Sequence, residues 1–234
     1  EWQDETDLSL VNRAAGAEKV KVRPELFDLM KYTLDVCAKT DGAFDPTFNA
    51  FWGLYNFKEG HHREPTDEEI KERLPLVNFR KIELDEEKKT IFLKSPGMKL
   101  GLGGLGQGYA VDAVLRDLQA HYKAGFVDGS GDTYFWGKKP NGADWIAAVR
   151  DPRDHSKNVL RIYGTNIAVT TSGDDEKFFM VGDRRVHHII DPRTGRPTTG
   201  VRQVTVISRR ALDADAYDTS VMVLGATRGK KLLE

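Results

Sequence analysis

The segment from Arg185 to Pro197 carries residue types that could do chemistry. It reads Arg-Val-His-His-Ile-Ile-Asp-Pro-Arg-Thr-Gly-Arg-Pro, so an apolar run with two histidines stops at an Asp-Pro and a Thr-Gly pair. This pattern predicts a strand over residues 186–190 that delivers polar side chains to a sharp turn. Because successive side chains of a strand point to opposite faces, His187 and His188 cannot chelate one ion together, and at most one of them faces a site. A histidine can act as an acid or base near neutral pH, although a packed or solvated histidine is the more common case.

A second segment, residues 213–219, reads Asp-Ala-Asp-Ala-Tyr-Asp-Thr. On a helix, Asp215 and Thr219 lie four positions apart, so a carboxylate and a hydroxyl project from one face. This arrangement suits a hard cation such as Mg²⁺. The plainer interpretation is that aspartates near the start of a helix interact favourably with its dipole. It does not explain Thr219, a poor residue for a helix interior unless its hydroxyl has a partner, so the pair is the first candidate for a metal site.

Residues 101–106, Gly-Leu-Gly-Gly-Leu-Gly, match the G-x-G-x-x-G pattern of dinucleotide-binding sites, and Asp128 follows about twenty residues later. Against such a site, the preceding segment is poorly hydrophobic, Asp128 opens another glycine-rich turn, and no regular β-α-β alternation follows. A helix start with glycines can hold a phosphate without that fold, and a tight structural turn is the remaining alternative.

Two further polar turns have both a functional and a plain interpretation. Residues 128–132, Asp-Gly-Ser-Gly-Asp, could cradle a ligand or form a hairpin turn whose carboxylates accept from their own backbone. Residues 170–176, Thr-Thr-Ser-Gly-Asp-Asp-Glu, follow an apolar run and either serve a polar ligand or solvate a loop. Taken alone, the first turn does not decide between the two interpretations, and the second is better read as a solvated loop.

The elements that must position these segments follow from apolar periodicity and capping residues. Helices are predicted over 24–39, from a capping box at 66–69 to Pro75, from Gly106 to near Gly125, and from Ala211 to about Leu224. Strands are predicted over 80–84, 90–93, 125–128, 133–136, 145–149, 159–163, 167–170 and 203–208, with a hairpin across 182–183. Many strands with few intervening helices predict an α+β fold of largely antiparallel sheet with flanking helices, in a single domain over 1–234.

The bulk composition excludes several classes of partner. The 234 residues carry 35 Lys and Arg against 36 Asp and Glu, a net charge of -1, so no basic field predicts a nucleic acid. No apolar run approaches the roughly 18 residues of a membrane span. The one cysteine, Cys37, falls on the predicted buried face of helix 24–39 and cannot form an intrachain disulfide.

Six segments stand in order along the chain: Asp41-Gly-Ala-Phe-Asp-Pro46, Leu102-Gly-Gly-Leu-Gly-Gln-Gly-Tyr-Ala-Val-Asp112, Asp128-Gly-Ser-Gly-Asp132, Thr171-Ser-Gly-Asp174, His187-His-Ile-Ile-Asp-Pro-Arg-Thr-Gly195 and Asp213-Ala-Asp-Ala-Tyr-Asp-Thr219. Together they resemble the ApbE family of FAD:protein FMN transferases, and the His-x-Ile-x-Pro-x-Thr-Gly portion is the most diagnostic. The resemblance spans nearly the whole chain and implies an ApbE-like, T-fold-related domain without the family's first and last strands.

The resemblance also implies a reaction. FAD would lie in a cleft with Mg²⁺ against its pyrophosphate, the ion held by Asp215, Thr219 and a backbone carbonyl near Gly106. A Thr or Ser hydroxyl of an acceptor protein, in a Ser/Thr-Gly-Ala-Thr-like segment, would attack the phosphorus on the FMN side and expel AMP. His188, Asp191 and Thr219 are the implied catalytic residues: His188 would deprotonate or orient the hydroxyl, and Asp191 would brace the turn or orient the acceptor.

The residues implied to contact FAD come from several of these segments. They are Trp2, Phe44, Tyr55, Gly104, Gly106, Gln107, Asp112, Asp128, Ser172, Gly173, Glu176 and His188. The three aromatic residues among them are expected to contact the flavin or adenine ring, with an ordinary core position as the alternative. Glu176 is expected to accept from the adenine or the ribose.

The chain departs from the family pattern at a few positions, which keeps other functions open. Gly101 and Gln107 stand where the family has an acidic residue and a lysine, and Asp128 stands where asparagine is common. Gln107 supplies hydrogen bonds without the charge. The alternatives are a Mg²⁺-dependent FAD pyrophosphatase that releases FMN and AMP, and a non-catalytic FAD-binding protein. Similar proteins usually work in the bacterial periplasm or at the outer face of the cytoplasmic membrane.

Overall fold

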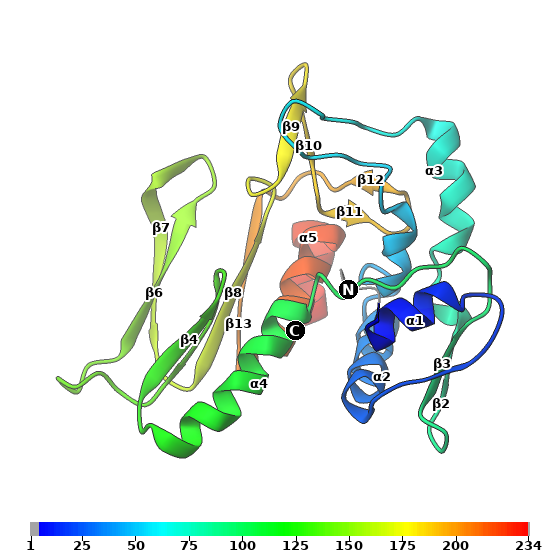
Figure 1. The fold of residues 1–234 in the computed structure, drawn as a ribbon. Helices are drawn as coiled ribbons and strands as arrows, with labels where there is room; N and C mark the ends of the chain where they lie inside the picture. The colour runs from blue at the N-terminus through cyan, green and yellow to red at the C-terminus, as the bar shows by residue number, and fades with distance from the viewer. Residues whose placement is uncertain (1–4, 234) are drawn as a thin grey trace. The chain divides into compact units, whose positions relative to one another are not determined.

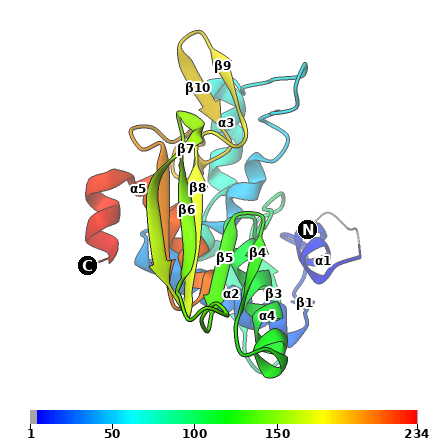
Figure 2. The same ribbon diagram turned by 90° about the vertical axis from the view of Figure 1, so that its left-hand side faces the viewer.

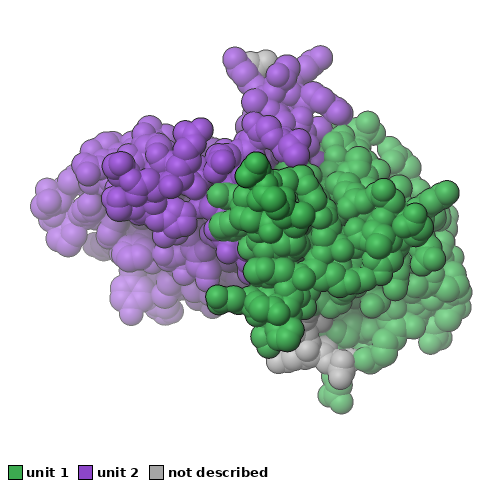
Figure 3. Space-filling view, turned by 90° about the horizontal axis from the view of Figure 1, so that it is seen from above, with its two compact units in different colours: residues 1–102, 178–198 green, residues 103–177, 199–234 purple. Residues whose placement is uncertain are grey.

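The computed structural model describes residues 5–233, which fall into two compact units (Figure 3). Unit 1 comprises the residues up to 102 together with 178–198, and unit 2 comprises 103–177 together with the residues from 199 onward. Helices accompany several antiparallel sheets, which confirms the predicted α+β class. The prediction of a single domain over 1–234 stays a prediction. Within the described range, no helix is both long and apolar enough to cross a bilayer.

The helices of unit 1 begin where the sequence supplies a cap or a proline. The α-helices are α1 (Asp7–Arg13), α2 (Pro24–Lys39) and α3 (Asp67–Arg73), and short 3-10 helices span Pro46–Phe51, Leu74–Leu76 and Phe79–Lys81. Pro24 takes the first position of α2, and Thr66 and Glu69 form the predicted capping box before α3. Both helix predictions are confirmed.

The described strands of unit 1 form three small antiparallel sheets (Figure 1). They are β1 (Val20–Lys21), β3 (Thr90–Leu93) and β2 (Ile82–Asp85) in that order; β9 (Phe178–Val181) with β10 (Arg184–His187); and β11 (Ile190–Asp191) with β12 (Arg196–Pro197). The predicted continuous strand over 186–190 is wrong. It breaks at His188 and Ile189, because the chain changes its pairing partner there from β9 to β12.

Unit 2 is built on one antiparallel sheet of four strands. Its order is β13 (Gln203–Ser208), β8 (Ile167–Gly173), β5 (Asp132–Trp136) and β4 (Gly125–Gly129). The other two strands, β6 (Trp145–Asp151) and β7 (Asp154–Gly164), pair only with each other, and β7 is longer than the predicted 159–163 (Figure 2). Each predicted strand of this unit is present.

Two helices of unit 2, α4 (Gly106–His121) and α5 (Ala211–Leu233), pack on its four-stranded sheet (Figure 1). Val111 and Leu115 of α4 and Ala214 of α5 bury apolar surface with residues of β5, β8 and β13. α4 ends earlier than the predicted Gly125, because the backbone turns extended directly after His121. Gly225 interrupts α5 with a φ of 76°, which matches the helix end predicted at about Leu224.

Candidate functional site

Asp215 of α5 meets the first turn of α4 inside unit 2. Its side chain is 5% exposed, and its Oδ2 accepts a hydrogen bond from the Gly108 amide at 2.8 Å. α4 receives no side-chain cap from its own N-terminal neighbour, which is Leu105. The Asp215 carboxylate therefore satisfies an amide that a helix start leaves open, and it lies at the positive end of the helix dipole.

Asp132 and Asp218 bring further buried carboxylates to the surroundings of Asp215. Asp132 begins β5, and Asp218 of α5 accepts a hydrogen bond from Ser172 Oγ at 2.8 Å. Burial raises the pKa of all three carboxyls, and repulsion from Asp215 raises the pKa of the other two further. The main influences on these pKa values are burial, hydrogen bonds and other carboxylates, with no lysine or arginine among them.

These oxygen atoms fit a divalent cation. Thr219 lies one helical turn after Asp215 and is half-buried, and its hydroxyl lies 3.2 Å from Ser172 Oγ and 3.3 Å from Asp218 Oδ1. Buried carboxylates without a basic partner are stabilised by a bound cation, and Mg²⁺ prefers such oxygen ligands. In the part of the chain that the structure describes, no three His, Cys, Asp or Glu side chains form a metal-binding group. A site here would combine Asp215 with a hydroxyl, a backbone carbonyl and water.

The glycine-rich segment forms the start of α4 and not the turn of a dinucleotide-binding unit, because it follows a loop and the sheet of unit 2 is antiparallel. Gly104 lies in the turn before the helix, and Gly106 is its first residue. A Cβ added to Gly106 would meet nothing within 4 Å, so the space at the helix start is open. Gln107 is exposed and its Nε2 donates to the Gly129 carbonyl at 3.1 Å, which links α4 to the β4–β5 turn.

The polar turns of unit 2 differ in what they do. Asp128 is exposed and accepts a hydrogen bond from the Gly131 amide at 2.8 Å, which agrees with a turn that bonds its own backbone. Ser172 and Gly173 end β8, so Ser172 stands beside the acidic residues of α5. Glu176 is exposed in the loop that follows β8.

Asp112 lies on α4, and its two carboxylate oxygens accept from the first amides of α5. The Ala211 amide donates to Oδ1 at 2.9 Å, and the Leu212 amide donates to Oδ2 at 3.1 Å. The residue was predicted to contact FAD. That contact stays a prediction, and both carboxylate oxygens of Asp112 are engaged by the start of α5.

The two adjacent histidines, His187 and His188, occupy different environments. His187 is 2% exposed, its Nε2 lies 2.9 Å from the Thr198 carbonyl, and its Nδ1 accepts from the Ile189 amide. Because Nδ1 accepts a hydrogen bond and Nε2 faces a carbonyl oxygen, the ring is assigned as neutral with its proton on Nε2. His187 therefore holds the backbone at Ile189 and at Thr198. His188 is half-buried in the break between β10 and β11. The prediction that the pair cannot act on one face assumed a continuous strand, which breaks at His188, so it stays a prediction.

Asp191 braces the turn between β11 and β12. Its carboxylate oxygens receive two hydrogen bonds from the Arg193 guanidinium, both at 2.8 Å, and one from the Arg193 amide at 2.9 Å. Its carbonyl accepts from the amides of Thr194 and Gly195. Of the two roles predicted for Asp191, bracing the turn is the one that these contacts support.

The predicted aromatic contacts are placed as follows. Phe44 is 5% exposed, which is the core position given as its alternative. Tyr55 is half-buried, donates from its hydroxyl to the Gly195 carbonyl at 2.7 Å and stacks on Phe57. Burial raises the pKa of Tyr55 to about 12, so the hydroxyl keeps its proton at neutral pH. Trp2 lies outside the described residues.

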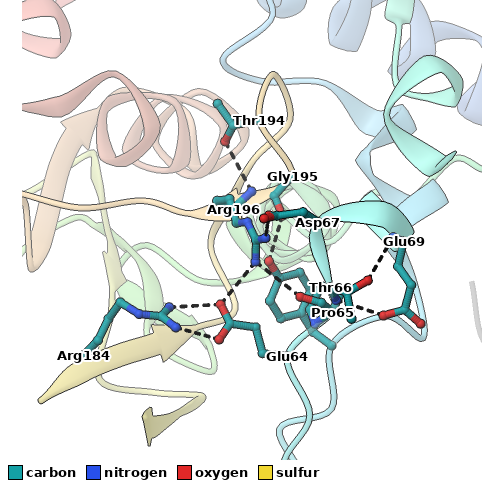
Figure 4. A network of polar contacts seen from close by, with 10 residues as sticks. Glu64, Pro65, Thr66, Asp67, Glu69, Arg184, Thr194, Gly195 and Arg196 are labelled. Atoms are coloured by element: carbon teal, nitrogen blue, oxygen red, sulfur yellow. Dashed lines mark hydrogen bonds and ion pairs between the residues drawn. The ribbon is translucent and has the colours of Figure 1, made fainter. Parts of the chain in front are cut away.

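An arginine network holds the β11–β12 turn of unit 1 (Figure 4). Arg196 contacts the carboxylates of Glu64 and Asp67 and the Pro65 carbonyl. Arg184 of β10 binds the same Glu64 with both terminal nitrogens, at 3.0 and 2.6 Å. The segment before α3 and the turn that follows His188 are therefore tied together.

Two of the three buried carboxylates, Asp132 and Asp218, were not predicted from the sequence as site residues. Asp218 is three positions after Asp215, a spacing that brings side chains together on a helix and that could have predicted it. Asp132 was seen only as the end of a glycine-rich turn. No sequence pattern indicates that the start of β5 lies against α5.

Comparison with known proteins confirms the resemblance to the ApbE family. The ApbE family model matches residues 1–234. The FAD:protein FMN transferase of Treponema pallidum is 32% identical to this chain, and the alignment covers 99% of this chain and 68% of the relative. A FAD:protein FMN transferase of Klebsiella pneumoniae is 30% identical, and the alignment covers 96% of this chain and 70% of the relative. Among solved structures, the ApbE protein of Thermotoga maritima superposes with a TM-score of 0.88 at 34% identity, covering 96% of this chain and 73% of that chain. The flavin transferase ApbE from Vibrio cholerae superposes with a TM-score of 0.87 at 28% identity, and the match covers 100% of this chain and 75% of that chain. This chain belongs to the ApbE family.

Proposed function

We propose that this chain is a Mg²⁺-dependent FAD:protein FMN transferase, which attaches FMN from FAD to a Thr or Ser hydroxyl of an acceptor protein and releases AMP. The observation that carries the proposal is the Asp215 carboxylate, buried against the first turn of α4 and one helical turn from Thr219. It occurs in a member of the ApbE family that is similar to FAD:protein FMN transferases along nearly its whole length.

The residues of unit 2 are suited to hold a diphosphate. The first turn of α4 offers backbone amides at the positive end of a helix dipole, and the open space at Gly106 admits a phosphate group. Asp215 and Thr219 are the proposed Mg²⁺ ligands, with the Gly106 carbonyl as a third. Mg²⁺, when bound, supplies positive charge against the oxygens of the diphosphate during phosphoryl transfer.

His188 is the proposed base for the acceptor hydroxyl. The hydroxyl oxygen forms a bond to the phosphorus on the FMN side of FAD, and the bond from that phosphorus to the bridging oxygen breaks. AMP leaves with the electron pair, and the hydroxyl proton passes to the imidazole, a group that exchanges protons near neutral pH. His187 is unsuited to this role, because both of its ring nitrogens are bonded to the backbone.

The deciding experiment combines the protein, FAD, Mg²⁺ and an acceptor with a Ser/Thr-Gly-Ala-Thr-like segment, and weighs the acceptor by mass spectrometry. We expect a gain of one FMN mass and release of an equal amount of AMP. An acceptor with valine at the target position and a reaction with EDTA serve as controls, and both should show no gain.

Two other outcomes overturn the proposal and identify the alternatives. Free FMN and AMP beside an unmodified acceptor indicate a FAD pyrophosphatase. Intact FAD that remains bound to the protein indicates a non-catalytic FAD-binding protein.

A further inference from the structure

α4 is capped by the other helix of unit 2. The helix follows Leu105, which has no capping side chain, and its regular bonding begins when the Tyr109 amide donates to the Leu105 carbonyl. The Gly108 amide therefore lies before the first bonded turn and has no acceptor within its own helix. Asp215 of α5 supplies that acceptor at 2.8 Å.

α5 is capped by α4 in return. It follows Arg210, whose side chain has no acceptor for an amide. Asp112 accepts from the Ala211 and Leu212 amides, the first two of the helix. Because both Asp112 oxygens are used, this contact fixes the direction as well as the position of the first turn of α5.

The spacing of these contacts is the same on both helices. Gly108 and Asp112 are four residues apart on α4, and Ala211 and Asp215 are four residues apart on α5. The helices touch at the glycine, where an added Cβ would lie 2.4 Å from the Ala211 carbonyl oxygen and 2.8 Å from Asp215 Cβ. One helical turn is a rigid unit, so the place where Ala211 is anchored sets the place of the Asp215 carboxylate.

We propose that Asp112 is a positioning residue for the cation site: it holds the first turn of α5 so that Asp215 presents its carboxylate at the start of α4, and it does not touch the cation. This inference rests on the proposed function, which places Mg²⁺ at Asp215. A plain helix cap would stabilise the fold and leave cation affinity unchanged. A residue that orients a ligand changes the affinity itself, typically by about 10–100-fold.

The test measures Mn²⁺ binding to the full chain by electron paramagnetic resonance, since Mn²⁺ takes the same oxygen ligands as Mg²⁺. In Asp112→Asn the amide group keeps the shape and one acceptor, so we expect the chain to fold and to bind Mn²⁺ about 10–100-fold more weakly. Asp117→Asn removes the same charge from an exposed position of α4 and should bind Mn²⁺ as the wild type does.

Equal Mn²⁺ affinity of Asp112→Asn and the wild type overturns the inference and leaves the proposed function intact. A wild-type chain that binds no Mn²⁺ overturns the proposed metal ligands, and this inference with them.

Amide hydrogen exchange gives a second measurement that needs no metal. The Gly108 amide reports the Asp215 contact, because it has no other acceptor in its helix. Asp112→Asn should speed exchange at Gly108 and leave the Leu115 amide, in the middle of α4, unchanged. Unchanged exchange at Gly108 contradicts the positioning role. Equal acceleration at both amides contradicts it as well, because Asp112 would then act only on overall stability.

Discussion

Glu64 in unit 1 contacts Arg196 of the predicted segment 185–197, and Asp215 in unit 2 belongs to the predicted segment 213–219, but the two carboxylates are held in opposite ways. Glu64 is bound by Arg184 and Arg196, and the hydrogen bond from Arg184 holds the pKa of the Glu64 carboxyl below its usual value (Figure 4). Asp215 is buried without a basic partner among the main influences on its pKa, and burial raises that pKa. The Glu64 carboxylate is paired with arginines of the chain itself, whereas the Asp215 carboxylate is held by backbone amides at the start of α4.

The largest expected effect comes from the Asp215 region. Asp215→Asn keeps the hydrogen bond from the Gly108 amide but removes the negative ligand of the proposed cation site. We expect transfer of FMN to fall by roughly 100–1,000-fold, which corresponds to about 3–4 kcal/mol of transition-state stabilisation. The measurement is the initial rate of acceptor labelling across a Mg²⁺ titration.

Asp213→Asn is the matched control for this change. Asp213 lies on the same helix and pairs with the exposed Arg210, so its loss should leave the rate within about twofold, as expected for a surface pair. If Asp215→Asn and the wild type label the acceptor at equal rates, Asp215 is not a ligand of the cation, and the contrast with Glu64 does not explain the Mg²⁺ dependence.

The close approach of α4 and α5 predicts the next largest effect. Gly108→Ala places a Cβ 2.4 Å from the Ala211 carbonyl oxygen, and the backbone of both helices must shift to admit it. We expect a loss of about 1–3 kcal/mol in the free energy of unfolding, measured by urea denaturation. Gly103→Ala, in the loop before α4 where an added Cβ meets nothing within 4 Å, should cost little. Equal losses in both variants would mean that the helices are not held at this distance.

The sequence predicted the local part of this site and not its assembly. Asp215 and Thr219 follow from helical spacing, and the start of α4 follows from its glycines and the apolar pattern after them. The contacts that complete the site join residues far apart, such as Asp112 with Ala211, 99 positions away. The break at His188 was missed because the apolar pattern of 186–190 continues through it, and only a change of pairing partner reveals it.

In unit 1, the contact of Tyr55 with the β11–β12 turn predicts a smaller effect. Tyr55→Phe removes the hydrogen bond to the Gly195 carbonyl and keeps the stacking on Phe57. We expect a loss of about 0.5–1.5 kcal/mol in the free energy of unfolding. The same substitution at Tyr163, whose side chain is exposed on β7, should be neutral. If Tyr55→Phe lowers the rate of FMN transfer under conditions where the variant is fully folded, the Tyr55 hydroxyl also contacts the ligand.

The smallest effect concerns Glu64 itself and depends on pH. The pKa of Glu64 is lower in the folded chain than its usual value of 4.5, so as the pH falls toward that value Glu64 takes up its proton in the unfolded chain before it does in the folded one. The stability that this group contributes is therefore complete above the unfolded-state pKa and is lost as the pH falls through the folded pKa. Arg184→Met removes the largest cause of the shift and should cost about 0.2–1 kcal/mol at pH 7, because Arg184 is half-exposed.

The pH dependence of this difference separates the ion pair from simple packing. Urea denaturation at pH 7, 5 and 3.5 should show the gap between the wild type and Arg184→Met closing toward acid pH, where Glu64 is protonated in both. Arg161→Met, an exposed arginine of β7 with the same change in charge, should show no such closing gap. A gap that stays constant from pH 7 to 3.5 would mean that Arg184 acts through its hydrocarbon stem. Glu64 would then not be neutralised by Arg184, and the contrast with Asp215 would have to rest on Arg196 alone.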